Sequence, residues 1–272
     1  MTDIHERTAF ITGGANGIGL AIARCFARAG AKLALADLDA GALIRAKAEL
    51  QDITQVETYM LDVRDRAAYA SAADAAERAL GPVTLLFNNA GVAGGDAVNR
   101  LTYELWDWYI NVNLYGVING LMAFLPKMLE RGLGGHIVNT ASGAGLVATG
   151  AGVLYTTSKF AVVGLSEELR INSEVKSAGI GVSVLCPNRV ATDIISRSLD
   201  AASSAGARIS EEQVKKQTMA GKALLQIGVS IDAVGEMVLK AVRENAPYII
   251  TDRQLEEMVK TRTQAILEAF PD

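Results

Sequence analysis

The chain has 272 residues, half of them hydrophobic, and a formal net charge of −4 at pH 7. A chain of this size can bury the core of one α/β domain, and its weakly acidic balance gives no basic surface for nucleic acid. We therefore expect a single domain over residues 1–272 and no nucleic-acid partner. Residues 1–7 are polar and lead directly into an apolar strand, and no uncharged stretch reaches the length of a membrane span. These features predict a cytoplasmic protein without a signal peptide or membrane contact.

Seven short, apolar, β-branched runs alternate with segments of helical length. They are residues 8–12, 32–37, 56–61, 83–87, 136–139, 181–185 and 248–250. This alternation predicts a doubly wound, Rossmann-like α/β fold with a parallel sheet, right-handed crossovers and helices on both faces. Ligands of such folds bind beyond the carboxyl ends of the strands, so the functional residues are expected there.

The first predicted strand leads into a glycine-rich turn and then an apolar helix. Gly13, Gly17 and Gly19 follow the spacing G-x-x-x-G-x-G. Glycines let the backbone approach a pyrophosphate, and a helix N-terminus offers free N–H groups and partial positive charge. A lone loop of this kind can also be an ordinary strand-to-helix turn. The second strand, however, ends on Asp37, at the distance expected for a ribose-binding carboxylate, which favours a dinucleotide site.

Tyr155 and Lys159 lie four residues apart, thirteen residues after Ser142. Positions i and i+4 share one face of a helix, so the ammonium would lie one turn from the phenol. A nearby cation favours the phenolate and brings its pKa, about 10 in water, toward the working range of a general acid or base. Such pairs also occur by chance on solvated helix faces, so the other motifs decide how this one is interpreted.

These segments together resemble the short-chain dehydrogenase/reductase family over about residues 7–192. Seven motifs stand in the family's order. They are residues 12–19, Asp62 with Val63, residues 88–91, Asn113, Ser142, Tyr155 with Lys159, and Pro187 with Thr192. The resemblance implies an enzyme that transfers a hydride between an alcohol and a nicotinamide cofactor.

The resemblance also implies a role for each of four catalytic residues. Tyr155 would exchange a proton with the substrate oxygen, which the Ser142 hydroxyl would hold by a positioned hydrogen bond. Lys159 would lower the pKa of the phenol and bind the nicotinamide ribose. Asn113 would fix a water that connects Lys159 to solvent. The cofactor-binding positions are Gly13, Asn16, Gly17, Ile18, Gly19, Asp37, Leu38, Asp62, Val63, Asn89, Ala90, Gly91, Tyr155, Lys159, Pro187, Val190 and Thr192.

Asp37 further indicates which cofactor is bound. Its carboxylate can accept both ribose hydroxyls of NAD and would repel the 2′-phosphate of NADP. Family members that use NADP usually carry a basic residue at the positions of Asn16 or Leu38. We therefore expect NAD, and oxidation of the alcohol as the physiological direction.

The residues expected to border the substrate are mainly small or apolar. They are Val92, Ala93, Gly143, Leu146, Val147, Leu154, Asn188 and Arg189, with parts of residues 194–225. Among these and the catalytic residues, the expected substrate contacts are Ser142, Leu146, Tyr155 and Asn188. Such a wall favours a bulky hydrophobic alcohol or ketone over a sugar or a phosphorylated metabolite. Asn188 and Arg189 stand where the family commonly has Pro-Gly, and Arg189 either meets a substrate carboxylate or points outward. Residues 193–228 have weak helical periodicity and are expected to form a substrate lid.

Three segments, residues 116–122, 135–138 and 246–251, resemble the bacterial Cα-dehydrogenases that oxidise benzylic alcohols in lignin-derived aryl ethers. We therefore expect an aryl or alicyclic secondary alcohol as substrate, with a steroid-like or terpenoid alcohol as the alternative. A catalytically silent NAD-binding regulator is a further alternative, against which the four intact catalytic residues argue. An epimerase or dehydratase would have a longer chain and a different glycine spacing.

Isolated residues and helix surfaces complete the predictions. Cys25, Cys186, His5 and His136 are far apart in the sequence, which favours packing roles over a disulfide or metal site. Helices predicted over residues 102–131 and 152–178 each carry more than one apolar face. The apolar residues are Leu114, Val117, Leu121, Leu125, Phe160, Val163, Leu165 and Leu169. In the family this surface pairs with a second copy of itself, so we expect a homodimer or homotetramer.

Overall fold

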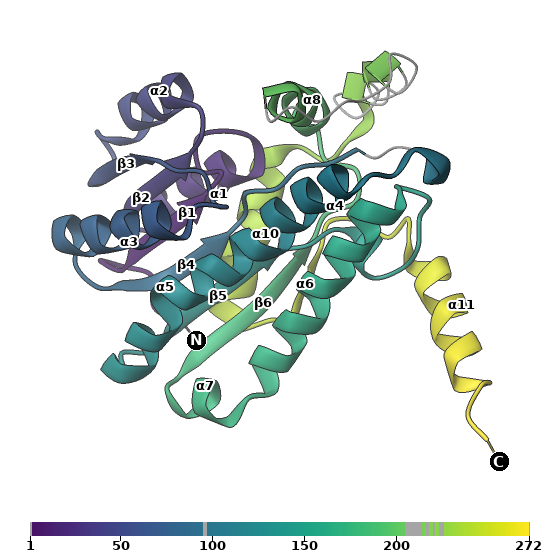
Figure 1. Ribbon diagram of the computed structural model, residues 1–272. Coiled ribbons are helices and arrows are strands. Elements are labelled where there is room, and N and C mark those ends of the chain that lie inside the picture. The colour runs from purple at the N-terminus through teal and green to yellow at the C-terminus, as the bar shows by residue number, and fades with distance from the viewer. Residues whose placement is uncertain are drawn as a thin grey trace.

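The computed structural model describes residues 2–94, 97–204, 214–215, 218–219, 221–222 and 226–271. Its centre is a seven-stranded parallel sheet in the order β3-β2-β1-β4-β5-β6-β7, with helices on both faces (Figure 1). The strands are β1 (Thr8–Thr12), β2 (Lys32–Asp37), β3 (Val56–Met60), β4 (Val83–Asn88), β5 (Gly135–Thr140), β6 (Ile180–Cys186) and β7 (Tyr248–Ile250). The predicted doubly wound α/β fold is confirmed, and each predicted strand end lies within one residue of the observed one.

Ten α-helices are described. They are α1 (Gly17–Arg28), α2 (Ala40–Leu50), α3 (Arg66–Leu80), α4 (Tyr103–Ile110), α5 (Gly116–Arg131), α6 (Val153–Ile171), α7 (Ser173–Ser177), α8 (Ile194–Ser204), α10 (Ile231–Glu244) and α11 (Glu256–Leu267). Short 3₁₀ turns cover Val98–Arg100 and Gly143–Gly145. Figure 1 shows α8 above the sheet and α11 extending away from the body of the molecule.

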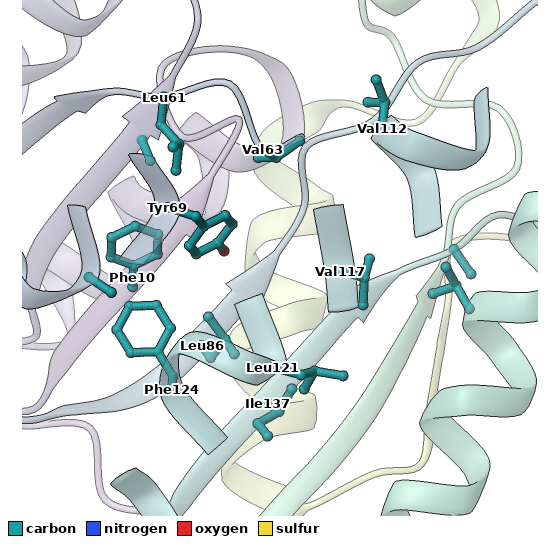
Figure 2. Close-up of a cluster of buried hydrophobic side chains, with 14 of the residues drawn as sticks. Phe10, Leu61, Val63, Tyr69, Leu86, Val112, Val117, Leu121, Phe124 and Ile137 are labelled. Carbon is teal, nitrogen blue, oxygen red and sulfur yellow. The ribbon is translucent and has the colours of Figure 1, made fainter. Parts of the chain in front are cut away.

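The core consists of two hydrophobic layers, one on each face of the sheet. Successive strand residues point to opposite faces, so Phe10 of β1 joins one layer and Ile11 joins the other. In the first layer the Phe10 ring packs against Phe124 of α5 and Tyr69 of α3, with centroids 4.8 and 5.9 Å away (Figure 2). Because both faces of the sheet are covered, the strands are continuously apolar. This explains why they could be predicted from short apolar runs in the sequence.

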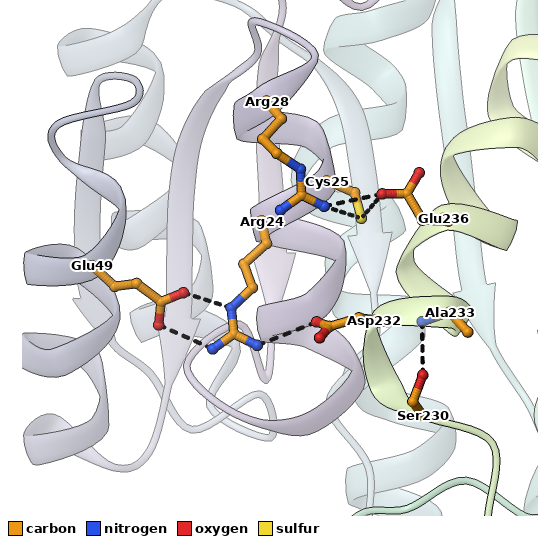
Figure 3. Close-up of polar contacts among 8 residues, drawn as sticks. All are labelled: Arg24, Cys25, Arg28, Glu49, Ser230, Asp232, Ala233 and Glu236. Atoms are coloured by element: carbon orange, nitrogen blue, oxygen red, sulfur yellow. Dashed lines mark hydrogen bonds and ion pairs between the residues drawn. The ribbon is translucent and has the colours of Figure 1, made fainter.

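On the opposite face, α1 and α10 approach each other closely. A Cβ atom at Gly235 would lie 2.6 Å from the Ala21 carbonyl oxygen, so only glycine allows this approach. At the edge of the contact, Arg24 bridges Glu49 and Asp232 (Figure 3). The Cys25 thiol lies in the same contact, and burial raises its pKa to about 12.

The isolated cysteines and His136 have the packing roles that were predicted. Cys25 and Cys186 are free and buried. His136 is also buried, and its Nε2 lies 2.8 Å from Ser183 Oγ. Burial lowers the pKa of His136 to about 3, so the imidazole stays neutral near pH 7.

Both predicted long helices are interrupted. The helix expected over residues 102–131 contains a π-helical turn at Asn111–Tyr115, where the Gly116 N–H donates to the Asn111 carbonyl. Such turns insert one residue into a helix and are frequent at functional sites. The helix expected over residues 152–178 ends at Ile171. There Asn172 leaves the helical conformation, and its side chain caps α7 by accepting two backbone N–H groups.

The predicted irregular lid is partly helical. Residues 194–204 form α8, and its Ser198 is buried and accepts the Ala93 N–H at 2.9 Å. Val190 and Val229 pair as an isolated bridge, so the two ends of the predicted lid lie next to each other. The remainder of the predicted lid, residues 205–213, 216–217, 220 and 223–225, lies outside the described residues.

One described helical stretch, Tyr103–Arg131, has the length and apolar composition of a membrane span. Half of its most apolar window is buried inside the fold. Val117, Leu121 and Phe124 pack into the core layer on this face of the sheet. That packing accounts for the apolar composition of the helix.

Candidate active site

A cavity of about 1270 Å³ lies beyond the carboxyl ends of the strands. It is lined by the segments that follow β1 through β6 and by residues of α4, α6 and α8. The strand order reverses between β1 and β4, and this switch point is where doubly wound sheets bind their ligands. Six of the seven predicted motifs contribute residues to the lining of this cavity, and the seventh, Asn113, is buried.

The glycine loop has the geometry of an anion-binding turn. Gly13 and Gly17 have φ angles of +62° and +51°, which L side chains rarely adopt, and both line the cavity. Helix α1 begins at Gly17 without a side-chain cap, so its first N–H groups remain available for a ligand. Gly19, a predicted cofactor contact, is not among the cavity-lining residues. A Cβ there would lie 2.0 Å from the Gly13 carbonyl oxygen, so Gly19 permits close packing within the loop.

Asp37 stands at the end of β2, on the wall of the cavity. Its carboxylate accepts the backbone N–H groups of Ala15 at 3.2 Å and Asp39 at 3.1 Å. Burial raises the pKa of Asp37, and these two hydrogen bonds act in the opposite direction. The residue is therefore oriented by the backbone on both sides, as a ribose-binding carboxylate requires. Leu38, Asp62 and Val63 line the same part of the cavity.

The segment after β4 is tied to the glycine loop. The Thr12 hydroxyl accepts the backbone N–H groups of Asn89 and Ala90 at 3.0 and 3.1 Å. The Asn89 side chain donates to the Thr12 carbonyl at 3.1 Å. Asn88, in contrast, is fully enclosed and donates to Asn139 of β5 at 2.9 Å. Asn89, Ala90 and Gly91 therefore line the cavity, whereas Asn88 joins two strands.

Ser142, Tyr155 and Lys159 lie on one wall of the cavity. Lys159 Nζ is 5.7 Å from the centre of the Tyr155 ring and donates to the Thr140 carbonyl at 3.0 Å. The Ser142 hydroxyl donates to the Pro187 carbonyl at 3.3 Å. Pro187, Val190 and Thr192, like Asn16 and Ile18 of the glycine loop, are predicted cofactor contacts that line the cavity.

The ionisation of the Tyr155/Lys159 pair is governed by burial. Burial raises the pKa of Tyr155, while a hydrogen bond with Ser142 lowers it. Burial also lowers the pKa of Lys159 to about 8. The sequence analysis expected Lys159 to bring the phenol pKa below its ordinary value. The net direction is the reverse here, because desolvation of the phenolate by burial outweighs the hydrogen bond with Ser142.

Asn113 lies on the π-helical turn and is completely buried. Its amide donates to the Val92 carbonyl at 3.0 Å and to Ser158 Oγ at 3.1 Å, and its oxygen accepts the Val92 N–H at 2.8 Å. Both amide hydrogens are thus used within the protein. Asn113 holds the loop after β4 against α6, one residue from Lys159.

Some of the residues predicted to border the substrate do not line the cavity. Leu146 packs against the core, and Val147 and Leu154 are buried in it, so none of the three lines the cavity. They follow Ser142 or precede Tyr155 in the sequence, but the chain turns them toward the protein interior. Gly143 and Arg189 are also absent from the lining, and Arg189 is exposed. The predicted residues Val92, Ala93, Asn188, Ile194 and Ile195 do line the cavity, and Ala97, Trp108, Val112 and residues 149–152 complete the wall.

The turn that replaces the family's Pro-Gly is held by the C-terminal segment. The Asn188 N–H donates to Thr251 Oγ1 at 3.1 Å, and its side-chain amide donates to Asp252 at 3.1 Å. These contacts explain why a residue with an amide side chain occupies this turn. Sequence reasoning also missed Arg197 of α8, which lines the cavity and contacts Asn16, 181 positions earlier. No local pattern signals a contact over that separation.

Comparisons with known proteins agree with this geometry. Residues 7–202 match the family model described as short chain dehydrogenase. The chain is 37% identical over 273 residues to a C alpha-dehydrogenase of Sphingobium sp. strain SYK-6, covering 99% of this chain and 88% of that protein. It is 36% identical over 190 residues to 3beta-hydroxysteroid dehydrogenase 2 of Eggerthella lenta, covering 69% and 72%. A solved short chain dehydrogenase/reductase from Burkholderia phymatum, in complex with NAD, superposes with a TM-score of 0.92 at 34% identity, covering 100% and 98% of the two chains.

Proposed function

The chain belongs to the short-chain dehydrogenase family, and from this membership we propose that it is an NAD-dependent oxidoreductase that interconverts a hydrophobic secondary alcohol and its ketone. The observation that carries the proposal is the placement of Ser142, Tyr155 and Lys159 on the same cavity as Asp37 and the glycine loop. One continuous cavity thus offers a cofactor site and a proton-transfer site.

The residues around the glycine loop fit NAD. The free N–H groups at the start of α1 and the left-handed Gly13 and Gly17 would hold the pyrophosphate. Asp37 would accept hydrogen bonds from the adenosine ribose, and Asp62 with Val63 would contact the adenine. When bound, NAD⁺ supplies the hydride acceptor. The relative solved in complex with NAD supports this assignment.

The chain's own residues would manage the proton of the reaction. In oxidation, the substrate hydroxyl gives its proton to the Tyr155 phenolate, while the carbinol hydrogen leaves with its electron pair as hydride. Ser142 holds the substrate oxygen through its hydroxyl, on the same cavity wall as the Tyr155 phenol. Lys159 is positively charged at pH values below its pKa of about 8, and its Nζ lies 5.7 Å from the centre of the Tyr155 ring.

Gly91 lies beside two members of the proposed proton relay. A Cβ atom at Gly91 would lie 3.1 Å from Asn113 Oδ1 and 3.4 Å from Lys159 Nζ. A side chain at this position would therefore crowd both polar atoms, and glycine leaves them in place. Asn113 Oδ1 uses one lone pair for the Val92 N–H and retains the other for a water. We propose that Asn113 Oδ1 accepts a hydrogen bond from a water that connects Lys159 to solvent.

The cavity wall and the relatives favour an aryl or alicyclic secondary alcohol. Ala93, Ala97, Ile194 and Ile195 make the wall largely apolar, and Trp108 adds an aromatic surface. The similarity to a C alpha-dehydrogenase supports a benzylic alcohol. The cavity volume of about 1270 Å³ and the hydroxysteroid dehydrogenase relative favour a steroid-like or terpenoid alcohol as the second candidate.

We expect the purified protein to form NADH when it is supplied with NAD⁺ and a secondary alcohol. The test compares kcat/KM for a benzylic alcohol of an aryl ether, a simple alicyclic alcohol and a 3β-hydroxysteroid, followed by NADH absorbance. The highest value is expected for the benzylic alcohol. A protein that binds NADH but oxidises none of the alcohols and reduces none of the ketones would instead be a silent cofactor-binding protein.

Alcohol oxidation is expected to become faster as the pH rises, because Tyr155 must be deprotonated to accept the proton. Burial raises the pKa of Tyr155 above the value of about 10 for an ordinary phenol, so this rise in rate is expected at alkaline pH. Ketone reduction needs the protonated phenol and should fall over the same range. Profiles of kcat/KM against pH, measured for alcohol oxidation and for ketone reduction, test this prediction. Profiles that rise or fall together in the two reactions would contradict it.

We also propose a homodimer or homotetramer. Leu114, Leu125, Leu165 and Leu169 are only partly buried at the surface formed by α5 and α6. Helix α11 buries none of its residues, and Phe270 beyond it is 69% exposed. Coverage by a second copy would remove this apolar surface from water. Light scattering at micromolar concentration is expected to give two or four times the chain mass, and a fully active monomer would rule the proposal out.

A further inference from the structure

One side chain of α8, Arg197, reaches the part of the cavity assigned to the cofactor. Its Nη2 donates to Asn16 Oδ1 at 2.8 Å, and its Nη1 lies 3.5 Å from Asp39 Oδ2. Its Nε donates to Asp193 Oδ2 at 2.6 Å, which anchors the guanidinium at the start of its own helix. Asn16 precedes α1 in the glycine loop, and Asp39 follows β2. Arg197 therefore joins α8 to both sides of the predicted ribose–phosphate site.

The contact with Arg197 determines which way the Asn16 amide faces. A guanidinium can only donate hydrogen bonds, so it must meet Oδ1, the single acceptor of the amide. The other amide atom, Nδ2, is buried and has no hydrogen-bond partner among the described residues. Buried N–H groups are nearly always paired in folded proteins, so an acceptor is expected to complete this one. Asn16 lines the cavity, which is where that acceptor would come from.

We propose that Arg197 is a cofactor-positioning residue that acts through Asn16. By holding Oδ1, it presents Nδ2 as a donor to an oxygen of the adenosine diphosphate half of the cofactor. The inference rests on the NAD binding proposed above. It adds the first described helix of the lid to the cofactor site, although this helix is remote in sequence from the glycine loop.

The test uses ADP-ribose, which carries the adenosine diphosphate half without the nicotinamide, titrated calorimetrically into the full chain. Asn16→Asp keeps an acceptor for Arg197 and replaces the Nδ2 donor by an oxygen. We expect it to raise the Kd at least about tenfold, because a donor becomes a repelling acceptor. Arg197→Met frees the amide to rotate, and we expect a smaller rise of about three- to tenfold. Arg197→Lys retains one donor group, so its Kd for ADP-ribose should lie between the values for Arg197→Met and the wild type.

Arg45→Met is the matched control. Arg45 is exposed on α2, and its charge acts on the Asp39 carboxylate, as the charge of Arg197 does. The Arg45→Met variant therefore removes one positive charge near Asp39 without touching the contact between Arg197 and Asn16. Its Kd should equal that of the wild type. Wild-type affinity in Arg197→Met or in Asn16→Asp would overturn the inference, as would equal weakening in Arg45→Met. A wild-type protein that binds no ADP-ribose would contradict the NAD assignment itself, which separates the two failures.

Discussion

Tyr155→Phe is expected to lower kcat at least about a thousandfold while leaving the Kd for NADH nearly unchanged, because the substitution removes only the proton-transferring hydroxyl. The phenyl ring keeps the packing of α6 against the core, so the wall of the cavity should persist. Single-turnover oxidation with saturating NAD⁺ gives kcat for the chemical step, and NADH fluorescence gives the Kd. Near-normal kcat in this variant would remove Tyr155 from the mechanism.

A matched control is Tyr248→Phe. The Tyr248 hydroxyl donates to Glu167 on the exposed surface, and the residue does not line the cavity. Losing this hydroxyl should leave kcat within about twofold of the wild type, since exposed hydrogen bonds contribute little. Lys159→Met should behave differently from both tyrosine variants. It should lose most turnover and also weaken NADH binding, because Lys159 is expected to contact the nicotinamide ribose.

We expect kcat/KM for NAD to exceed that for NADP by at least about a hundredfold. The 2′-phosphate would remove hydrogen bonds to Asp37 and place charge beside its carboxylate, and about 1.4 kcal/mol corresponds to each factor of ten. Besides Arg64, which pairs with Asp62, the cavity wall carries a second cation that no sequence motif indicated, Arg197. It already contacts Asp39 and Asp193 and lies in the field of Asp37, so the group remains net negative.

Steady-state kinetics with the two cofactors tests the discrimination. Asp37→Asn should narrow the ratio, because it removes the carboxylate charge while keeping one acceptor oxygen. Asp52→Asn, at an exposed position after α2, should leave the ratio unchanged. Equal use of NAD and NADP by the wild-type enzyme would show that Asp37 does not select the cofactor.

Local sequence signals were sufficient for most of the fold. The strand predicted over residues 32–37 is β2 with the same bounds, and the other strands differ by at most one residue at each end. The reason is that a sheet covered on both faces needs continuous apolar strands, and the glycines and polar residues that follow them stand out. The motifs at the strand ends were equally local. Their common position followed from the rule that parallel strands present their carboxyl ends at one edge.

The tertiary structure decided the features that depend on residues distant in the chain. Leu154 precedes Tyr155, yet it faces the core, and Trp108 of α4 occupies the cavity wall. Arg197 and Asn16 meet only because α8 folds back over the glycine loop. The ionisation of Tyr155 also depends on burial by several elements, so the spacing to Lys159 alone could not predict its direction. Hydrophobic periodicity and short motifs report on neighbours along the chain, whereas burial and long-range contacts arise when separate elements exclude water from the same space.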